Sequence, residues 1–148
     1  MFFLKELPAK RMIEGYTARY PQADADTIER ALVMMRDASL LVRRIDGFFA
    51  AGGFSQLRFL VLIVIDREPE RDSLYMTEIA ARLDVSRPVT TRTVQSLIKA
   101  GLVEATGHKD DKRQKLITIT TAGHARLQQL LPDYYALISE FMSGRAPD

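Results

Sequence analysis

The stretch of sequence that decides the fold covers residues 76–119 and reads MTEIAARLDVSRPVTTRTVQSLIKAGLVEATGHKDDKRQKLITI. Apolar residues in its first half recur every three or four positions, which is typical of one buried face of a helix. They do so in two short segments separated by a break. Two runs of strand-forming residues then flank a polar segment. The sequence therefore predicts two short helices followed by a β-hairpin.

The first helix is predicted to begin at Thr77, a residue type that often caps the N-terminus of a helix. Its apolar face is formed by Ile79, Ala80 and Leu83. We expect it to end at Asp84, because aspartate tolerates the left-handed backbone conformation better than most residues. Ser86 would then cap the second helix, with Pro88 in its first turn, where the missing N–H costs little. Two helices this close in sequence must cross at a steep angle.

The second helix has one apolar and one polar face, and Gly101 is placed to end it. Its apolar face comprises Thr90, Val94, Leu97 and Ile98. Arginine, glutamine and lysine on the other face can reach base edges and phosphates when a helix lies in the major groove of DNA. The candidate DNA-contact residues here are Ser86, Arg87, Pro88, Val89, Thr91, Arg92, Gln95, Ser96 and Lys99. Taken alone, this helix is equally consistent with a solvated amphipathic helix.

The hairpin concentrates positive charge. Residues 102–106 and 115–120 have strand propensity, and residues 107–114 between them are polar and rich in turn formers. Residues 87–115 contain seven basic and three acidic side chains, a net charge of +4, whereas the whole chain carries +2. A local positive field of this kind is expected of a protein that binds duplex DNA. The candidate contacts on the hairpin are His108, Lys109, Asp111, Lys112, Arg113 and Lys115.

These residues resemble the DNA-binding core of the MarR family of bacterial transcription regulators. Asp111 and Arg113 match the Asp-x-Arg signature of its hairpin wing, and residues 116–123, LITITTAG, match its returning strand and the start of the next helix. The resemblance implies that Arg113 enters a minor groove while Asp111 orients it. Three positions depart from the family pattern, namely Asp84, Pro88 and Thr90. They leave open which DNA sequence is read.

The flanking sequence predicts further helices. Residues 24–47 have helical periodicity, and Gly52-Gly53 ends that segment. A second helix is expected from Phe54-Ser55 to about Glu68, mainly because of the resemblance, since residues 59–65 suit a buried strand as well. Residues 73–75 are expected to form a short strand that pairs with the hairpin. Thr90, although polar, can bond a carbonyl one turn back in its helix.

Both chain ends carry apolar stripes at helical spacing, over residues 7–20 and 121–142, with Pro132 as a kink or break. In the resembled family such ends interlock as a homodimer, and a twofold dimer would read a palindromic site. The alternative is that they pack on their own chain. The candidate dimer residues are Met12, Ile13, Tyr16, Tyr20, Leu130, Leu131, Tyr134, Ile138 and Phe141.

The predicted fold class is thus mostly α with a small β-hairpin wing (α+β), a winged helix-turn-helix with dimerisation helices at both ends. All of residues 1–148 would form a single domain. Within it, residues 55–120 would be the DNA-binding lobe, and residues 1–50 and 121–148 the dimerisation region.

Composition argues against several other classes of protein. The chain has no cysteine, which excludes disulfides, and its two histidines make a dedicated metal site improbable. Gly52-Gly53 lacks the lysine and hydroxyl residue of a phosphate-binding loop, and no catalytic residues are predicted. The longest apolar run is seven residues, too short for a membrane span, so we expect a cytoplasmic protein without cofactor or membrane contact.

The resemblance also implies an effector, because members of that family often bind small aromatic or phenolic acids beside the DNA-binding lobe. Aromatic rings near a cation suit such an anion, although core packing explains most of them equally well. The candidate pocket residues are Tyr16, Phe48, Phe49, Phe54, Arg58 and Phe59. Two other functions remain open, a winged-helix protein-interaction module without base preference and RNA binding. The narrow major groove of A-form RNA disfavours the latter.

Overall fold

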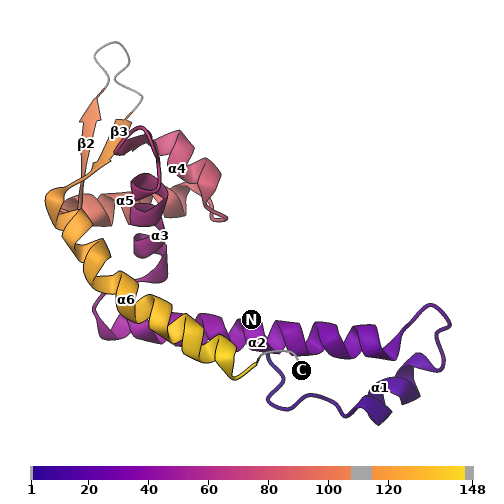
Figure 1. The fold of residues 1–148 in the computed structure, drawn as a ribbon. Coiled ribbons are helices and arrows are strands. Elements are labelled where there is room, and N and C mark those ends of the chain that lie inside the picture. The colour runs from indigo at the N-terminus through magenta and orange to yellow at the C-terminus, as the bar shows by residue number, and fades with distance from the viewer. Residues whose placement is uncertain (1, 108–114, 146–148) are drawn as a thin grey trace. The chain divides into compact units, whose positions relative to one another are not determined.

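The computed structural model describes residues 2–107 and 115–145, and Figure 1 shows their fold. By its contacts the chain divides into two units, Met1–Ile45 and Asp46–Asp148. The described residues form six helices and three strands. This composition agrees with the predicted class, mostly α with a small β-hairpin.

The N-terminal unit contains helix α1 (Lys10–Thr17) and most of helix α2 (Ala25–Ala51). The Asp24 carboxylate caps α2 by accepting from the Thr27 N–H at 2.9 Å. Lys10 of α1 forms an ion pair with Asp26 of α2 at 2.6 Å. Helix α1 is shorter than the predicted residues 7–20. Its N-cap Ala9 is extended, and Leu7 and Tyr20 each precede a proline, which disfavours helical geometry at those two residues.

Helix α3 (Gln56–Asp66) is the central element of the C-terminal unit and packs against α5 and α6. It begins at Ser55, whose hydroxyl accepts from the Arg58 N–H at 3.2 Å. The apolar residues at 59–65 are helical, so the helix reading of this segment is confirmed and the strand alternative is wrong. Five side chains of α3 are buried, namely Phe59, Val61, Leu62, Val64 and Ile65.

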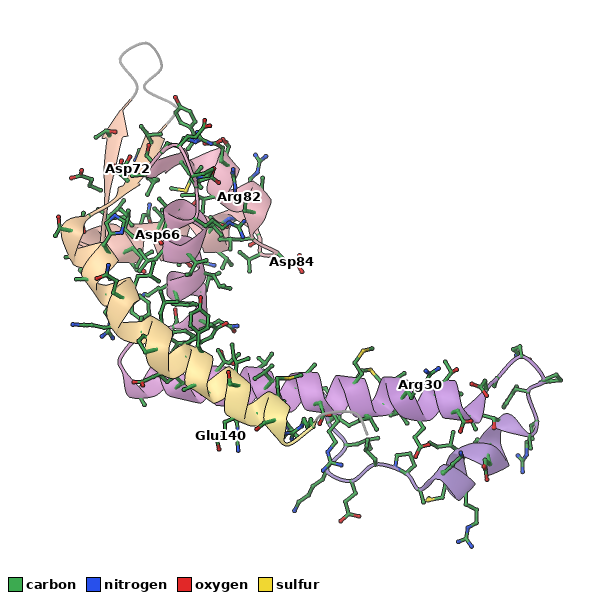
Figure 2. The ribbon with its side chains drawn as sticks, in the orientation of Figure 1. Arg30, Asp66, Asp72, Arg82, Asp84 and Glu140 are labelled. Carbon is green, nitrogen blue, oxygen red and sulfur yellow. The ribbon has the colours of Figure 1, made fainter. Side chains whose placement is uncertain are left out.

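Strand β1 (Ser73–Tyr75) leads into helix α4 (Met76–Arg82). The prediction that Thr77 caps this helix is wrong, because the helix begins one residue earlier. The Glu78 carboxylate instead accepts from the Tyr75 N–H at 2.8 Å, so this backbone donor at the start of the helix has a partner. The prediction that Asp84 has a left-handed backbone conformation is also wrong, since no non-glycine residue described here has a positive φ. The chain leaves α4 through Leu83 in an extended conformation, and Asp84 then projects away from the helix (Figure 2).

Helix α5 (Arg87–Lys99) follows, with Ser86 at the N-cap position and Pro88 in its first turn, as predicted. The Ser86 side chain makes no capping bond. The predicted burial is confirmed for Thr90, Val94 and Leu97, but Ile98 is 37% exposed. At 100° per residue, Ile98 falls at the margin of the face that the other three define.

The wing strands are β2 (Val103–Gly107) and β3 (Lys115–Ile119), in a sheet of order β1-β3-β2. Both pairings are antiparallel. Strand β2 pairs from Val103 opposite Ile119 to Gly107 opposite Lys115, and β1 pairs from Ser73 opposite Thr118 to Tyr75 opposite Leu116. The prediction that residues 73–75 pair with the hairpin is confirmed.

Helix α6 (Thr121–Ser143) leaves the base of the wing (Figure 1). Its N-cap, Thr120, accepts from the Gly123 N–H at 3.0 Å. Pro132 lies inside the helix and does not end it. Within the described ranges, no single helix is long and apolar enough to cross a membrane. The joined pair α2 and α3 meets the length and composition criteria across its bend, as core helices also can.

Candidate nucleic-acid interface

Helix α5 presents a polar face to solvent. Its buried side packs against α3, α4 and β2, which fixes the helix on the body of the lobe. We call the exposed side chains the α5 polar face, and they are Arg87, Arg92, Gln95 and Lys99. Ser86 and Pro88 are exposed beside it, and Val89 and Thr91 are half-buried. The α5 polar face carries three cations and one amide, which suits contact with bases and phosphates.

Thr90 is a polar residue on the buried face of α5. Its side chain is 1% exposed, and its hydroxyl donates to the Ser86 carbonyl at 3.3 Å. The expected bond to a carbonyl one turn back is therefore confirmed, and the buried hydroxyl has a partner.

The C-terminal end of α5 is closed by glycine, as predicted. Gly101 has φ +71°, a conformation that favours glycine. Its N–H donates to the Ile98 carbonyl at 2.9 Å, and the Leu102 N–H donates to the Leu97 carbonyl at 3.0 Å. This Schellman arrangement turns the chain directly into β2, so the wing begins at a fixed place beside the helix.

Charged residues hold α4 against the loop before it. The Arg71 guanidinium donates to the two Glu78 carboxylate oxygens at 2.6 and 3.2 Å, and Arg82 pairs with Glu68 at 2.9 Å. The Arg71 contact, followed by the Tyr75 N–H, lowers the pKa of Glu78 below its ordinary value of 4.5. These bonds orient the first helix of the helix-turn-helix.

Ser96, a candidate DNA contact, faces the protein. It is half-buried, its hydroxyl accepts from the Arg58 Nε–H at 3.0 Å, and it donates to the Thr93 carbonyl at 2.7 Å. Arg58 was expected in a ligand pocket. The structure brings together two residues, 38 positions apart, that sequence reasoning placed in separate sites.

Of the wing candidates, Lys115 is exposed at the start of β3. The other five lie outside the described residues, and they are His108, Lys109, Asp111, Lys112 and Arg113.

Among the described residues of the C-terminal unit, the rings of Phe48, Phe49, Phe54, Phe59 and Tyr134 form an aromatic cluster, and the ring of Tyr135 adjoins that of Tyr134. The centroids of Phe49 and Phe59 are 5.0 Å apart, and those of Phe59 and Tyr134 are 4.7 Å apart. Phe49 and Phe59 are fully buried, so core packing accounts for these two pocket candidates. Burial also raises the pKa of Tyr134 above its ordinary value of 10.0. The remaining pocket candidate, Tyr16, belongs to the N-terminal unit.

Sequence reasoning missed Arg126 of α6. Its guanidinium lies 5.3 Å from the centre of the Phe54 ring, and the same group donates to the Gly52 carbonyl at 2.8 Å. Arg58 lies 6.0 Å from that ring as well. No local pattern signals these contacts, because Arg126 and Gly52 are 74 positions apart.

The dimer candidates divide by exposure. Met12, Tyr16 and Tyr20 are exposed, whereas Ile13, Leu130 and Phe141 are buried. The other three, Leu131, Tyr134 and Ile138, are half-buried. An apolar pocket of about 230 Å³ in the N-terminal unit is lined by Pro8, Met12, Ile13, Tyr16, Thr17 and Ile28. Exposed apolar side chains also occur on α2, at Val33, Met34, Met35 and Val42.

Among the residues that the structure describes, no three histidine, cysteine or carboxylate side chains are grouped as a metal ion would require. His124 of α6 instead lies 3.0 Å from the Asp66 carboxylate at the end of α3. This contact links α3 to α6.

Two helices joined by a short turn, followed by a hairpin on a three-stranded sheet, define the winged helix-turn-helix class. Residues 53–114 match the model of the MarR family. The chain is also 32% identical over 142 residues to the HTH-type transcriptional repressor YetL of Bacillus subtilis, covering 95% of this chain and 84% of YetL. The protein belongs to the MarR family of transcriptional regulators, as the sequence resemblance implied. This membership supports the expectation of a regulator and not an enzyme.

Two solved structures share the fold. One is Sco3205, a MarR family transcriptional regulator from Streptomyces coelicolor in complex with DNA. It has a TM-score of 0.75 and 22% identity, and the match covers 84% of this chain and 78% of Sco3205. The other is Bordetella bronchiseptica BpsR, whose DNA binding is regulated by 6-hydroxynicotinic acid. Its TM-score is 0.67 with 15% identity, over 78% of this chain and 80% of BpsR.

Proposed function

We propose that this protein is a transcription regulator, acting as a repressor, that binds a specific sequence in double-stranded DNA. The α5 polar face is the observation that carries the proposal. It is exposed, rich in donors and backed by the buried residues Thr90, Val94 and Leu97, which is the arrangement that a helix needs to enter a major groove. The repressor function named for the relative YetL and the DNA bound by Sco3205 support it.

The wing would extend the interface into the adjacent minor groove. Lys115 begins β3 with an exposed side chain and would reach the phosphate backbone. Arg113, oriented by Asp111, would enter the groove. His108, Lys109 and Lys112 would add contacts to the backbone. These roles rest on the match of residues 111–113 to the family signature.

A homodimer would place two such interfaces on one palindromic operator. Exposed Met12, Tyr16 and Tyr20, the apolar pocket that Met12 and Tyr16 line, and the exposed apolar residues of α2 all favour a protein partner for the N-terminal unit. In this proposal residues 1–50 and 121–148 dimerise, and residues 55–120 bind DNA. Such a regulator would act in the cytoplasm, where its DNA lies.

A small aromatic or phenolic acid is proposed as an effector. Support comes from BpsR, whose DNA binding responds to 6-hydroxynicotinic acid, and from Phe54, which has the guanidinium groups of Arg58 and Arg126 near its ring. Two cations and a ring suit an aromatic carboxylate. Titration calorimetry with salicylate tests this proposal directly, with an Arg126→Ala variant as the comparison.

The main test is selection of binding sites from random duplex DNA by the purified protein at about 150 mM salt, where nonspecific binding is weak. Enrichment of a palindrome with half-sites about one helical turn apart supports a dimeric regulator. Arg92→Ala or Gln95→Ala should then reduce discrimination at single base positions by about 1–3 kcal/mol. A folded protein that enriches no motif would favour the protein-interaction module instead.

A further inference from the structure

The bond between Arg58 and Ser96 lies at the edge of the α5 polar face. Ser96 follows Gln95 directly and lies one helical turn after Arg92. Its hydroxyl accepts from Arg58 at 3.0 Å, and both side chains are only partly accessible. A bond from α3 to this point resists rotation of α5 about its own axis. The rotation of a helix decides which side chains it directs into a groove.

Arg58 is itself held from the other side. Its guanidinium lies 6.0 Å from the centre of the Phe54 ring, in the turn between α2 and α3. In that turn Gly53 has φ +64°, and the Phe54 N–H donates to the Phe49 carbonyl at 2.8 Å. Arg126 fixes the same turn to α6 through Gly52. A continuous series of contacts therefore runs from α6 through the turn to α5.

We infer that Arg58 is a positioning residue for the α5 polar face, and that Ser96 receives this contact and does not touch DNA. The inference rests on the proposed function, in which α5 enters the major groove. It assigns Arg58 a role in DNA recognition beside the effector contact at Phe54 proposed above. It also removes Ser96 from the set of base-contacting residues while keeping it necessary for specific recognition.

The test compares affinity for the selected operator with affinity for an unrelated duplex at the same salt concentration. Arg58→Ala and Ser96→Ala should each weaken operator binding about three- to tenfold, the effect of losing one hydrogen bond. Binding to the unrelated duplex should change much less. Ser96→Thr retains the hydroxyl and should retain operator affinity. Gln95→Ala is the comparison for a direct base contact: it should weaken operator binding as well, but without loosening α5.

The double variant Arg58→Ala/Ser96→Ala separates positioning from direct contact. If the two residues act through one bond, the double variant binds no more weakly than the worse single variant. Additive losses would overturn the inference, because Ser96 would then contact DNA by itself. Equal weakening of both duplexes by Arg58→Ala, with a smaller salt dependence, would overturn it too, since Arg58 would be a phosphate contact.

Amide hydrogen exchange of α5 without DNA keeps this inference distinct from the proposed function. Exchange in α5 should be faster in Arg58→Ala and Ser96→Ala than in the wild type, and unchanged in Gln95→Ala. If the wild type binds no duplex, the proposed function fails, and faster exchange still supports the link between α3 and α5. Unchanged exchange in both variants overturns that link.

Discussion

A methyl group added at Gly123 would lie 2.1 Å from the carbonyl oxygen of Leu102. Real carbon atoms do not approach a carbonyl so closely, and the obstacle is backbone, which cannot rotate away. Helix α6 therefore touches the start of the wing at this point with no room for a side chain.

Gly123→Ala should destabilise the protein by more than about 3 kcal/mol, because the helix and the turn must separate. Thermal unfolding measures the effect. Gly47→Ala in α2 is the matched control, since open space surrounds that helical glycine. It should stabilise the protein by about 0.5–1 kcal/mol. A Gly123→Ala variant as stable as the wild type would contradict the close packing.

Thr120 connects the same helix to the end of α5. Its hydroxyl accepts from the Gly123 N–H at 3.0 Å and donates to the Gly101 carbonyl at 2.7 Å. Thr120→Ala should cost about 1–2 kcal/mol of unfolding free energy, the effect of losing a helix cap. Thr120→Ser keeps both bonds and should cost far less. Denaturant titration distinguishes the two, and equal losses would show that the hydroxyl does not matter.

Thr90→Val should change the unfolding free energy by less than about 1 kcal/mol. The Ser86 carbonyl that accepts from the Thr90 hydroxyl also accepts from the Thr90 N–H at 3.0 Å, so it keeps a partner. Thr90→Ala removes the buried methyl group as well and should cost about 1 kcal/mol more. A large loss in Thr90→Val, measured by denaturant titration, would mean that the hydroxyl has a further role.

Glu78 should make stability depend on acid pH. Arg71 and the Tyr75 N–H hold the pKa of this carboxyl below 4.5 in the folded protein. A lowered folded-state pKa means that the carboxylate stabilises the fold above about pH 4.5, and that this stabilisation is lost as pH falls through the folded-state value. The difference in unfolding free energy between wild type and Glu78→Gln should therefore shrink below pH 4.5. A difference that stays constant from pH 7 to pH 3 would contradict this assignment.

Arg113→Ala should weaken operator binding by about tenfold or more if the wing enters a minor groove. Lys112→Ala is the comparison, and it should weaken operator and unrelated duplex alike while lowering the salt dependence. Fluorescence anisotropy at two salt concentrations measures both. Near-unchanged affinity in Arg113→Ala would remove the wing from the mechanism.

Local signals in the sequence predicted the elements that depend on local physics. Gly101 ends α5 because its own backbone conformation allows the turn. Residue type predicted strands at 102–106 and 115–120, and the structure has them at Val103–Gly107 and Lys115–Ile119. The segment 59–65 was ambiguous, because α3 is buried on so many sides that its apolar residues show little helical periodicity. There the family resemblance, and not the periodicity, favoured a helix.

The predictions failed where a neighbouring side chain competes with the local signal. Thr77 is a good cap by type, but the Glu78 carboxylate reaches the Tyr75 N–H and starts the helix earlier. The candidate site had a different difficulty. Exposure of Arg92 and Gln95 follows from helical periodicity alone, whereas the contact between Arg58 and Ser96 depends on how α3 packs against α5. No spacing in the sequence encodes such a contact.

The strand order β1-β3-β2 has an evolutionary consequence. Strand β1 pairs with β3 from Leu116 to Thr118, and β2 pairs with it from Lys115 to Ile119. Strand β3 is therefore held by backbone bonds on both sides, and these bonds do not depend on which side chain stands at an exposed position such as Lys115. Substitutions at such exposed positions can accumulate at little cost to folding. A lineage could thus change its preferred operator by altering a few wing codons, while the rest of the gene stays under selection for a stable fold.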